Sequence, residues 1–147
     1  MDDIDKKILR ILKNNARMPY LTIGKQINLS TSAVMERVRK LARDGVIRQY
    51  TAIISGKAFE KELTALMFIS LESPEHNDEF LGFVNNESDI LECHYITGNY
   101  DYHLKIVTKN PETLEHLLNK IKSQTGVVKT FTNIVLNTSK NEYSINP

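Results

Sequence analysis

Residues 20–50, with the sequence YLTIGKQINLSTSAVMERVRKLARDGVIRQY, constrain the fold of this chain more than any other segment. They predict a short helix at about 19–27, a second helix at about 31–43, and a strand over Val46–Ile54. The second helix has apolar residues on one face and arginines on the other. This arrangement is typical of a helix-turn-helix, whose second helix lies in a groove of DNA.

A further helix over residues 3–14 precedes this motif, because apolar residues recur there at helical spacing, as Ile4, Ile8, Ile11 and Leu12. Asn28 tolerates the left-handed conformation in which many helices end, and Ser30 is a typical N-cap for the helix that follows. Gly45 is suited to the end of that helix. The amino-terminal part of the chain therefore predicts three helices and a strand.

The charges are divided unevenly along the chain. Residues 1–57 carry 12 Lys and Arg against 5 Asp and Glu, whereas residues 58–147 carry 7 against 13, so the near-neutral total of +1 conceals a basic part and an acidic part. This asymmetry indicates a module that binds a polyanion, joined to a second domain with another role.

The second part of the chain alternates between strand and helix patterns. The predicted order is strand 63–71, helix 78–85, strands 90–97 and 100–108, helix 111–124, and strand 127–137. The order βαββαβ is typical of a ferredoxin-like fold, with one antiparallel sheet and both helices on one face. Because the helices cover only that face, we expect a second sheet, from another subunit, to cover the other.

The dipeptide Gly98-Asn99 predicts a two-residue turn between the middle strands. With that turn, residues whose numbers sum to 197 face each other, which pairs opposite charges and apolar residues: Glu92 with Lys105, Cys93 with Leu104, Leu91 with Ile106, and Tyr95 with Tyr102. His94 then lies opposite His103, without a third ligand at a suitable spacing. We interpret these two as a cross-strand imidazole pair rather than a metal site.

Several classes of protein do not fit the sequence. The single cysteine, Cys93, is expected to pack in the core and allows no internal disulfide, which suits a reducing cytoplasm. No apolar run approaches the roughly 18 residues that span a bilayer, and the start MDDIDKK is unlike a secretory signal. No catalytic nucleophile motif and no glycine-rich phosphate loop is present, so an enzyme is not expected.

Five segments, in order, resemble the Lrp/AsnC or feast/famine family of transcriptional regulators. They are D-x-x-I-L-x-x-L from Asp5, L-S-x-S-x-V-x-E-R-V-R-x-L from Leu29, G-V-I-x-x-Y from Gly45, T-G-N-Y-D-Y-x-L from Thr97, and T-x-T-x-x-V-L from Thr130. The resemblance implies an α+β protein with a winged helix-turn-helix and a ferredoxin-like ligand-sensing domain of the RAM or ACT type. It also implies dimers that assemble into tetramers or octamers and bind an amino acid between subunits.

The candidate DNA-binding residues lie on and around the second helix of the motif. Ser30, Thr31 and Ser32, at its start, can hold a phosphate through hydroxyl and backbone N–H groups, or can serve as caps only. Met35, Glu36 and Arg39 are best placed to reach base edges. Phosphate contacts are expected from Lys25, Lys40, Arg43 and Arg48. Arg37 lies beside the core positions and can instead pair with an acidic residue.

The candidate effector-binding residues follow from the resemblance. Gly98, Asn99, Tyr100 and Asp101 match the family's effector loop, in which Asp101 could meet an α-ammonium group and backbone N–H groups a carboxylate. Alternatively, this loop is only a hairpin turn. The final strand adds lesser candidates, Thr130, Thr132 and Thr138. Many relatives have an acidic residue at 99 and an aliphatic one at 103, so Asn99 and His103 leave the ligand open.

We therefore expect a homo-oligomeric regulator that binds double-stranded DNA, responds to an amino acid and acts in the cytoplasm on nucleoid DNA. No metal, other cofactor or membrane partner is expected. The expected domains are 1–50 for DNA, a connection over 51–62, and 63–147 for effector binding and assembly. Two alternatives are an architectural DNA-wrapping protein without an effector and a small enzyme on a ferredoxin-like scaffold.

Overall fold

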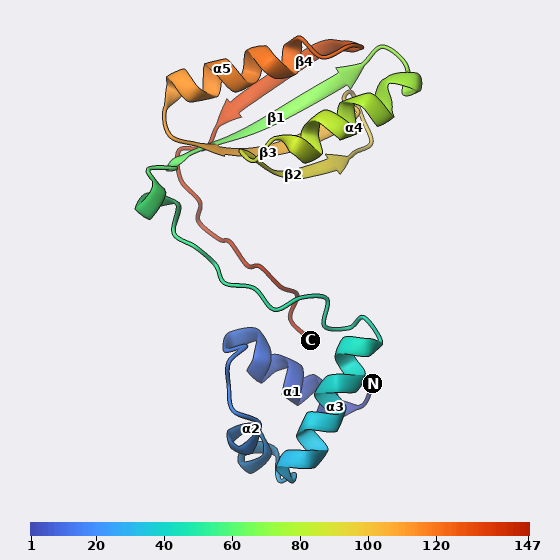
Figure 1. The fold of residues 1–147 in the computed structure, drawn as a ribbon, viewed down its shortest axis with the longest axis vertical. Helices are drawn as coiled ribbons and strands as arrows, with labels where there is room; N and C mark the ends of the chain where they lie inside the picture. Colours follow the sequence, from blue (N-terminus) through green and yellow to red (C-terminus); the bar gives the residue numbers. More distant parts are fainter. The chain divides into compact units, whose positions relative to one another are not determined.

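The computed structural model describes residues 1–147, which form two compact units (Figure 1). Residues 1–53 and 140–147 make up the first unit, and residues 54–139 make up the second. In the first unit the terminal segment is attached to α1, because Lys13 Nζ lies 2.8 Å from Glu142 Oε2 and Arg10 Nε donates to Pro147 O at 2.8 Å. The chain therefore leaves the first unit once and returns to it.

The first unit contains three helices, α1 (Asp3–Asn14), α2 (Tyr20–Ile27) and α3 (Thr31–Arg43), as predicted. Each contributes apolar residues from one face to a small core, namely Ile8, Leu12, Ile23, Val34 and Val38. The predicted ends are also confirmed. Asn28 is left-handed with φ of 58°, Ser30 Oγ accepts from Ala33 N at 3.2 Å, and Gly45 has φ of +72°.

The predicted strand over Val46–Ile54 is wrong, because residues 46–54 form no strand and α3 ends in a turn. Val46 N and Ile47 N both donate to Leu41 O, at 2.9 and 3.1 Å. The first unit contains no strand that could pair with residues 46–54 and receive the ladder hydrogen bonds that a strand needs. The winged part of the predicted motif is therefore missing from the isolated chain, and Tyr50 and Ile53 are left more than half exposed.

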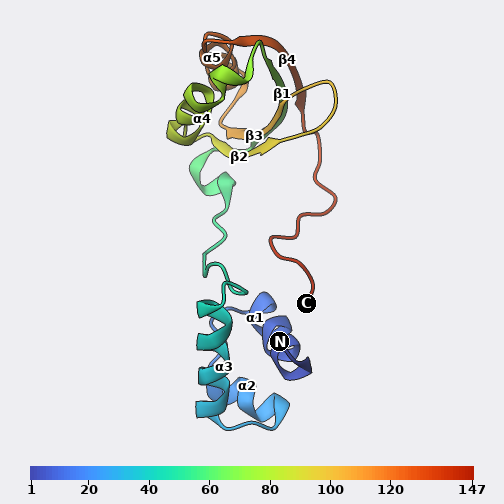
Figure 2. The ribbon, with the colours of Figure 1, turned by 90° about the vertical axis from the view of Figure 1, so that its right-hand side faces the viewer.

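The second unit has the predicted βαββαβ order. Its strands are β1 (Leu63–Leu71), β2 (Ile90–Tyr95), β3 (Tyr102–Thr108) and β4 (Val127–Ile134), and its helices are α4 (Asn77–Asn86) and α5 (Pro111–Lys122). The antiparallel sheet has the order β2-β3-β1-β4, and both helices lie on one face of it (Figure 2). Two short 3₁₀ helices that the sequence did not predict, η1 (Gly56–Phe59) and η2 (Pro74–His76), precede β1 and α4.

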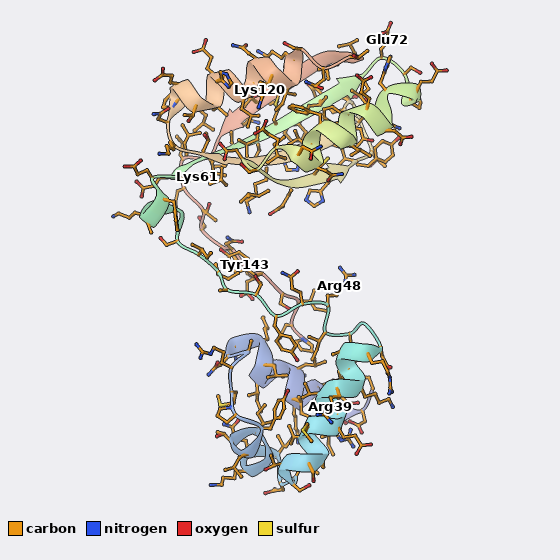
Figure 3. The ribbon with its side chains drawn as sticks, in the orientation of Figure 1. Arg39, Arg48, Lys61, Glu72, Lys120 and Tyr143 are labelled. Carbon is orange, nitrogen blue, oxygen red and sulfur yellow. The ribbon has the colours of Figure 1, made fainter.

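The core of the second unit fills the space between the sheet and its two helices. Its largest fully buried members are Met67, Ile69, Phe80, Leu104, Ile106 and Ile121, and Cys93 packs against this core as predicted. Ion pairs connect elements at the margin of this core. Lys120 on α5 pairs with Glu87 after α4, and Lys61 before β1 pairs with Asp89 before β2 (Figure 3). Because both helices lie on one face, no helix of the chain covers the opposite face of the sheet.

The predicted register of β2 and β3 is confirmed over four residue pairs, from Glu92↔Lys105 to Tyr95↔Tyr102. It is wrong at Leu91, because an irregularity between Ile90 and Glu92 brings Ile90 opposite Ile106 and leaves Leu91 59% exposed. The turn is also longer than two residues. Ile96 N donates to Asp101 O at 2.8 Å, so residues 97–100 form a four-residue loop in which Gly98 has φ of +117°.

Candidate DNA-binding surface and effector loop

The exposed face of α3 carries most of the predicted DNA-binding residues. Val34, Val38 and Leu41 are buried on one side of the helix. Since each residue advances the helix by about 100°, the opposite side presents another set, all exposed: Ser32, Glu36, Arg39, Lys40 and Arg43. Met35 lies at the margin and is half-buried. The structure thus brings the predicted base-reading and phosphate-binding side chains onto one surface.

The cations of this surface differ in whether the chain already neutralises them. Arg39 and Lys40 have no acidic partner within salt-bridge distance, and the same is true of Lys25 on α2 and Arg48 after α3. Arg43 Nε lies 3.4 Å from Asp44 Oδ1, but its side chain is 75% exposed. Such an exposed pair is weak, so Arg43 is still available to a phosphate.

The amino end of α3 offers hydrogen-bond donors beside these cations. Ser30 Oγ accepts from Ala33 N at 3.2 Å and lies 3.1 Å from Ser32 Oγ, which confirms its role as N-cap. The first amides of a helix have no intrahelical acceptor, so those of Thr31 and Ser32 are free to face an anion. Thr31 and Ser32 are both exposed. A phosphate could therefore be held there without disturbing the cap.

Arg37 does not belong to this exposed surface. Its Nη1 donates to Asp2 Oδ2 and to Asp5 Oδ1, each at 2.8 Å, which confirms the alternative that it pairs with an acidic residue. Hydrogen bonds to both carboxylates raise the pKa of the guanidinium. An open groove of about 670 Å³ lies next to this cluster, lined on one side by Met1, Asp2 and Asp5 and on the other by residues of α3.

Gly24 in α2 is a residue that the sequence analysis missed. Leu29 N donates to Gly24 O at 2.9 Å where the chain turns toward α3, and Leu29 O would lie only 2.4 Å from a Cβ atom on residue 24. No side chain fits there without moving backbone. The signal was a glycine inside an eight-residue helix, since glycine costs about 1 kcal/mol there relative to alanine unless close packing requires it.

The segment Gly98–Asp101, predicted to bind an effector, is fastened to β1. Asp101 Oδ2 accepts from Leu71 N at 2.8 Å, and Asp101 N donates to Ile69 O at 2.8 Å. Ser70 Oγ donates to Asn99 O at 3.3 Å. One oxygen of the Asp101 carboxylate therefore accepts a hydrogen bond within the chain, and Oδ1 has no partner there.

Tyr100 connects this loop to the uncovered face of the sheet. Its ring centroid lies 5.7 Å from that of Phe68, and Lys129 Nζ lies 4.8 Å from the centroid of the Tyr100 ring. Thr130 and Thr132 pair with Ile69 and Met67, so they lie on the face that the helices cover, away from Tyr100. Thr138 is exposed beyond the end of β4. The predicted effector residues are thus not gathered at one place within a single chain.

Aromatic side chains cover the middle of the uncovered sheet face. The Phe68 ring lies between those of Phe131, at 6.3 Å, and His103, at 4.7 Å. His94 stacks beyond His103 with centroids 6.2 Å apart, which confirms the predicted imidazole pair. Glu92 accepts from Lys105 at the margin. We call the residues Phe68, His94, His103 and Phe131 the aromatic face.

His103 is expected to make the stability of this unit dependent on pH. Its Nε2 is buried without a partner, and burial, with the neighbouring His94, lowers the pKa of the imidazole. The folded protein thus favours neutral His103, so its contribution is complete above the ordinary pKa of about 6.5 and is lost as pH falls below that value. The free energy of unfolding should decline as pH falls below about 6.5, as urea titrations at a series of pH values would measure.

The matched variants are His103→Phe and His116→Gln. Phenylalanine preserves the stack on Phe68 without a titratable group, so His103→Phe should flatten the decline. His116 is an exposed residue of α5, and its replacement should leave the decline as in the original protein. An unchanged decline in His103→Phe would show that other groups cause it.

Comparison with known proteins gives both units an assignment. The model of the AsnC-type helix-turn-helix domain matches residues 1–42, and that of the Lrp/AsnC ligand binding domain matches residues 64–145. The chain belongs to the Lrp/AsnC family. The resemblance found in the five sequence segments is therefore confirmed, and so is the α+β fold class.

Individual members of the Lrp/AsnC family are similar over nearly the whole chain. The HTH-type transcriptional regulator FL11 of Pyrococcus horikoshii is 39% identical over 140 residues, covering 95% of this chain and 92% of the relative. The crystal structure of a transcriptional regulator from Neisseria meningitidis in complex with L-methionine has a TM-score of 0.94 and 27% identity, with 99% and 96% of the two chains covered.

A second solved relative is the feast or famine regulatory protein from M. tuberculosis complexed with L-methionine. It has a TM-score of 0.90 and 29% identity, and 99% of each chain is covered. The present chain is thus a transcriptional regulator of the Lrp/AsnC type. None of its helices has the length and apolarity that crossing a bilayer requires.

Proposed function

We propose that this Lrp/AsnC regulator recognises specific DNA sequences by placing the exposed face of α3 in the major groove. The observation that carries the proposal is the pair of unneutralised cations, Arg39 and Lys40, on the side of α3 opposite its buried residues. Arg39 can donate two hydrogen bonds to guanine, and Glu36 can accept from cytosine. Lys40, Lys25 and Arg48 supply phosphate contacts that carry affinity rather than sequence preference.

The second part of the proposal is assembly through the aromatic face. Phe68 and Phe131 lie on the side of the sheet that no helix of the chain covers, and Phe131 is 50% exposed. A second copy of the same sheet would remove these rings from water. Two or more three-helix units would then be joined, so that weak binding by each adds up to a useful affinity for DNA.

The third part is regulation by an amino acid at the loop over residues 97–101, between subunits. The two solved relatives hold L-methionine. The loop of the present chain offers Gly98 at positive φ, backbone N–H groups for a carboxylate, and an oxygen of Asp101 that has no partner in the chain. Thr138 is exposed and would contribute from a neighbouring subunit, whereas Thr130 and Thr132 face the helices of their own chain. Ligand binding would favour one assembly over another in proportion to its difference in affinity for the two.

This function assigns roles to the parts of the chain. Residues 1–50 bind DNA, residues 51–62 connect, and residues 63–147 assemble and sense the effector, apart from residues 140–147, which return to the first unit. The protein would act where the chromosome lies, in the cytoplasm and on nucleoid DNA. The relatives are named as regulators, which agrees with a role other than catalysis.

Arg39→Ala tests the contact to bases. The variant should bind its preferred duplex about 1–3 kcal/mol more weakly, because a guanidinium that donates two hydrogen bonds to guanine contributes about that much discrimination. Fluorescence anisotropy on a duplex selected with the original protein, and on a random duplex, measures the effect. An equal loss on both duplexes would make Arg39 a phosphate contact instead.

Asp101→Asn tests the contact to the effector. The amide oxygen can still accept from Leu71 N, whereas Asp101→Ala would leave that amide without an acceptor and cost about 1–3 kcal/mol of stability. We expect Asp101→Asn to fold normally and to bind L-methionine, used as the probe, at least tenfold more weakly, since the charge that faces the ammonium group is gone. Calorimetric titration that gives equal affinities would remove Asp101 from the site.

One observation favours the alternative of an architectural DNA-wrapping protein. Asp101 has a structural partner in Leu71 N, so the loop is explained without any ligand. An amino-acid panel distinguishes the two functions by gel filtration of the protein with and without DNA. A shift with at least one amino acid supports regulation, whereas DNA bending that no amino acid changes supports the architectural function.

A further inference from the structure

One charged cluster of the three-helix unit lies beside the surface that faces DNA in the proposed function, and it lines the same open groove as Glu36, Arg39 and Lys40. Arg37 is part of α3, between the buried stripe of that helix and exposed Lys40. Its Nη1 donates at 2.8 Å to each of two carboxylates at the amino end of α1, Asp2 and Asp5. A single guanidinium therefore fastens α3 to the start of α1.

The two carboxylates form a closed network with the cap of α1. Asp2 Oδ1 accepts from Asp5 N at 2.8 Å, and Asp5 Oδ2 accepts from Asp2 N at 3.0 Å. Each carboxylate thus uses one oxygen for the capping box and the other for Arg37. The cap hydrogen bonds, followed by the guanidinium, lower the pKa of Asp2. Both carboxylates are therefore charged near neutral pH, and both are held in place.

This network limits the rotation of α3 about its own axis. The buried side chains Val34, Val38 and Leu41 attach the helix through apolar contact, which has no preferred direction. Side chains reach about 5–6 Å from the axis of a helix, so a rotation of roughly 20° moves their ends by about 2 Å. That displacement is enough to break a hydrogen bond to a base edge. Two charge-assisted hydrogen bonds from Arg37 restrain the rotation directly.

The charges of the cluster also argue against a phosphate contact. Arg37 is already matched by two carboxylates, so the three groups together carry a net negative charge. The Asp5 side chain is only 14% exposed and that of Arg37 is 32% exposed, so this pair does not turn freely into solvent. A DNA phosphate would have to compete with Asp2 and Asp5 for the guanidinium, and both would repel it.

We propose that Arg37 is a positioning residue for DNA recognition: held by Asp2 and Asp5, it fixes the rotation of α3 so that Glu36 and Arg39 meet base edges. This inference rests on the proposed function of α3. It gives Arg37, Asp2 and Asp5 a role in sequence specificity, although none of the three side chains contacts DNA.

The test compares Arg37→Gln, Asp5→Asn and the double variant on a duplex selected with the original protein and on a random duplex. Each single variant should bind the selected duplex roughly tenfold more weakly, a loss typical of one charge-assisted hydrogen bond. Binding to the random duplex should stay within about twofold, because phosphate contacts tolerate rotation. The slope of log K against log salt should not change. Because both residues act through one contact, the affinity of the double variant should equal that of the single variant with the lower affinity.

Arg43→Gln is the matched control on the same helix, since its guanidinium is exposed. It should weaken binding to both duplexes and reduce the salt slope by about 0.9, as expected for one lost phosphate contact. The same signature in Arg37→Gln would overturn the proposal, and so would original affinity for the selected duplex in a folded variant. If Arg37→Gln does not fold, Asp5→Asn and Arg37→Lys test the proposal through the same affinities for the two duplexes and the same salt slope. Failure of the original protein to bind any duplex would refute the proposed function instead.

Discussion

Phe68→Asp is expected to convert the assembled protein into a monomer of 16.8 kDa and to weaken binding to its selected duplex by roughly a hundredfold. Phe68 lies at the centre of the aromatic face, between the rings of His103 and Phe131. An aspartate there would be buried against the second sheet without a partner, which costs far more than its exposure in a monomer. The helix-covered core does not include Phe68, so the monomer should remain folded.

Sedimentation equilibrium measures the mass of the variant, and anisotropy on the selected duplex measures the affinity. Phe59→Asp is the matched control, because Phe59 is 60% exposed and lies in η1, outside the sheet. It should keep both the assembly and the affinity. If Phe68→Asp assembles like the original protein, the uncovered face of the sheet is not the contact between subunits.

Gly24→Ala should cost about 1–3 kcal/mol of stability and roughly a hundredfold or more of affinity for the selected duplex. The added Cβ would lie 2.4 Å from Leu29 O, and the atom that must move belongs to backbone. Leu29 directly precedes Ser30, the N-cap of α3, so the displaced backbone shifts the start of the recognition helix. Every base contact of α3 depends on that start.

The control for Gly24→Ala is a second helical glycine with empty space around it. A Cβ on Gly82 in α4 would meet no atom within 4 Å, and the residue does not have positive φ. Gly82→Ala should therefore raise stability by about 0.4–1 kcal/mol and leave DNA binding unchanged. Thermal unfolding of the two variants should shift in opposite directions. A shift of both to higher temperature would contradict the close approach of Leu29 O.

Local signals allowed the helices and part of the sheet to be predicted from the sequence. The predicted ranges 3–14 and 31–43 agree with α1 and α3, because the apolar spacing and the cap residues that determine a helix all lie within the helical segment or next to it. The register of β2 and β3 could be predicted over four pairs for the same reason, since the turn joins them directly. The partner predicted for Leu91 was wrong, because no residue pattern in the sequence predicts the register shift between Ile90 and Glu92.

What depended on distant segments could not be predicted. Val46–Ile54 has a strand-like sequence, but a strand forms only beside a partner, and the chain provides none there. Thr130 and Thr132 face the helices because β4 pairs with β1 across more than 60 residues of sequence. Asp101 is held by Leu71 for the same kind of reason. In each case the deciding contact is not local.

The candidate DNA surface was predicted more completely than the effector site. Helical spacing alone separates Glu36, Arg39, Lys40 and Arg43 from the buried stripe of α3, and the structure places them as expected. The partners of Arg37 come from α1, so the sequence could only offer pairing as an alternative. The effector loop was found through resemblance, which identified its residues but not their contacts with β1.

The most direct test of the account is the salt dependence of DNA binding by the full chain. Anisotropy titrations of the original protein on a labelled selected duplex, from about 50 mM to about 200 mM salt, should give a linear fall of log K against log salt. Arg39→Ala should lower K on that duplex at every salt concentration while binding random DNA like the original protein. Absence of binding by the original protein at the lowest salt concentration would contradict the account.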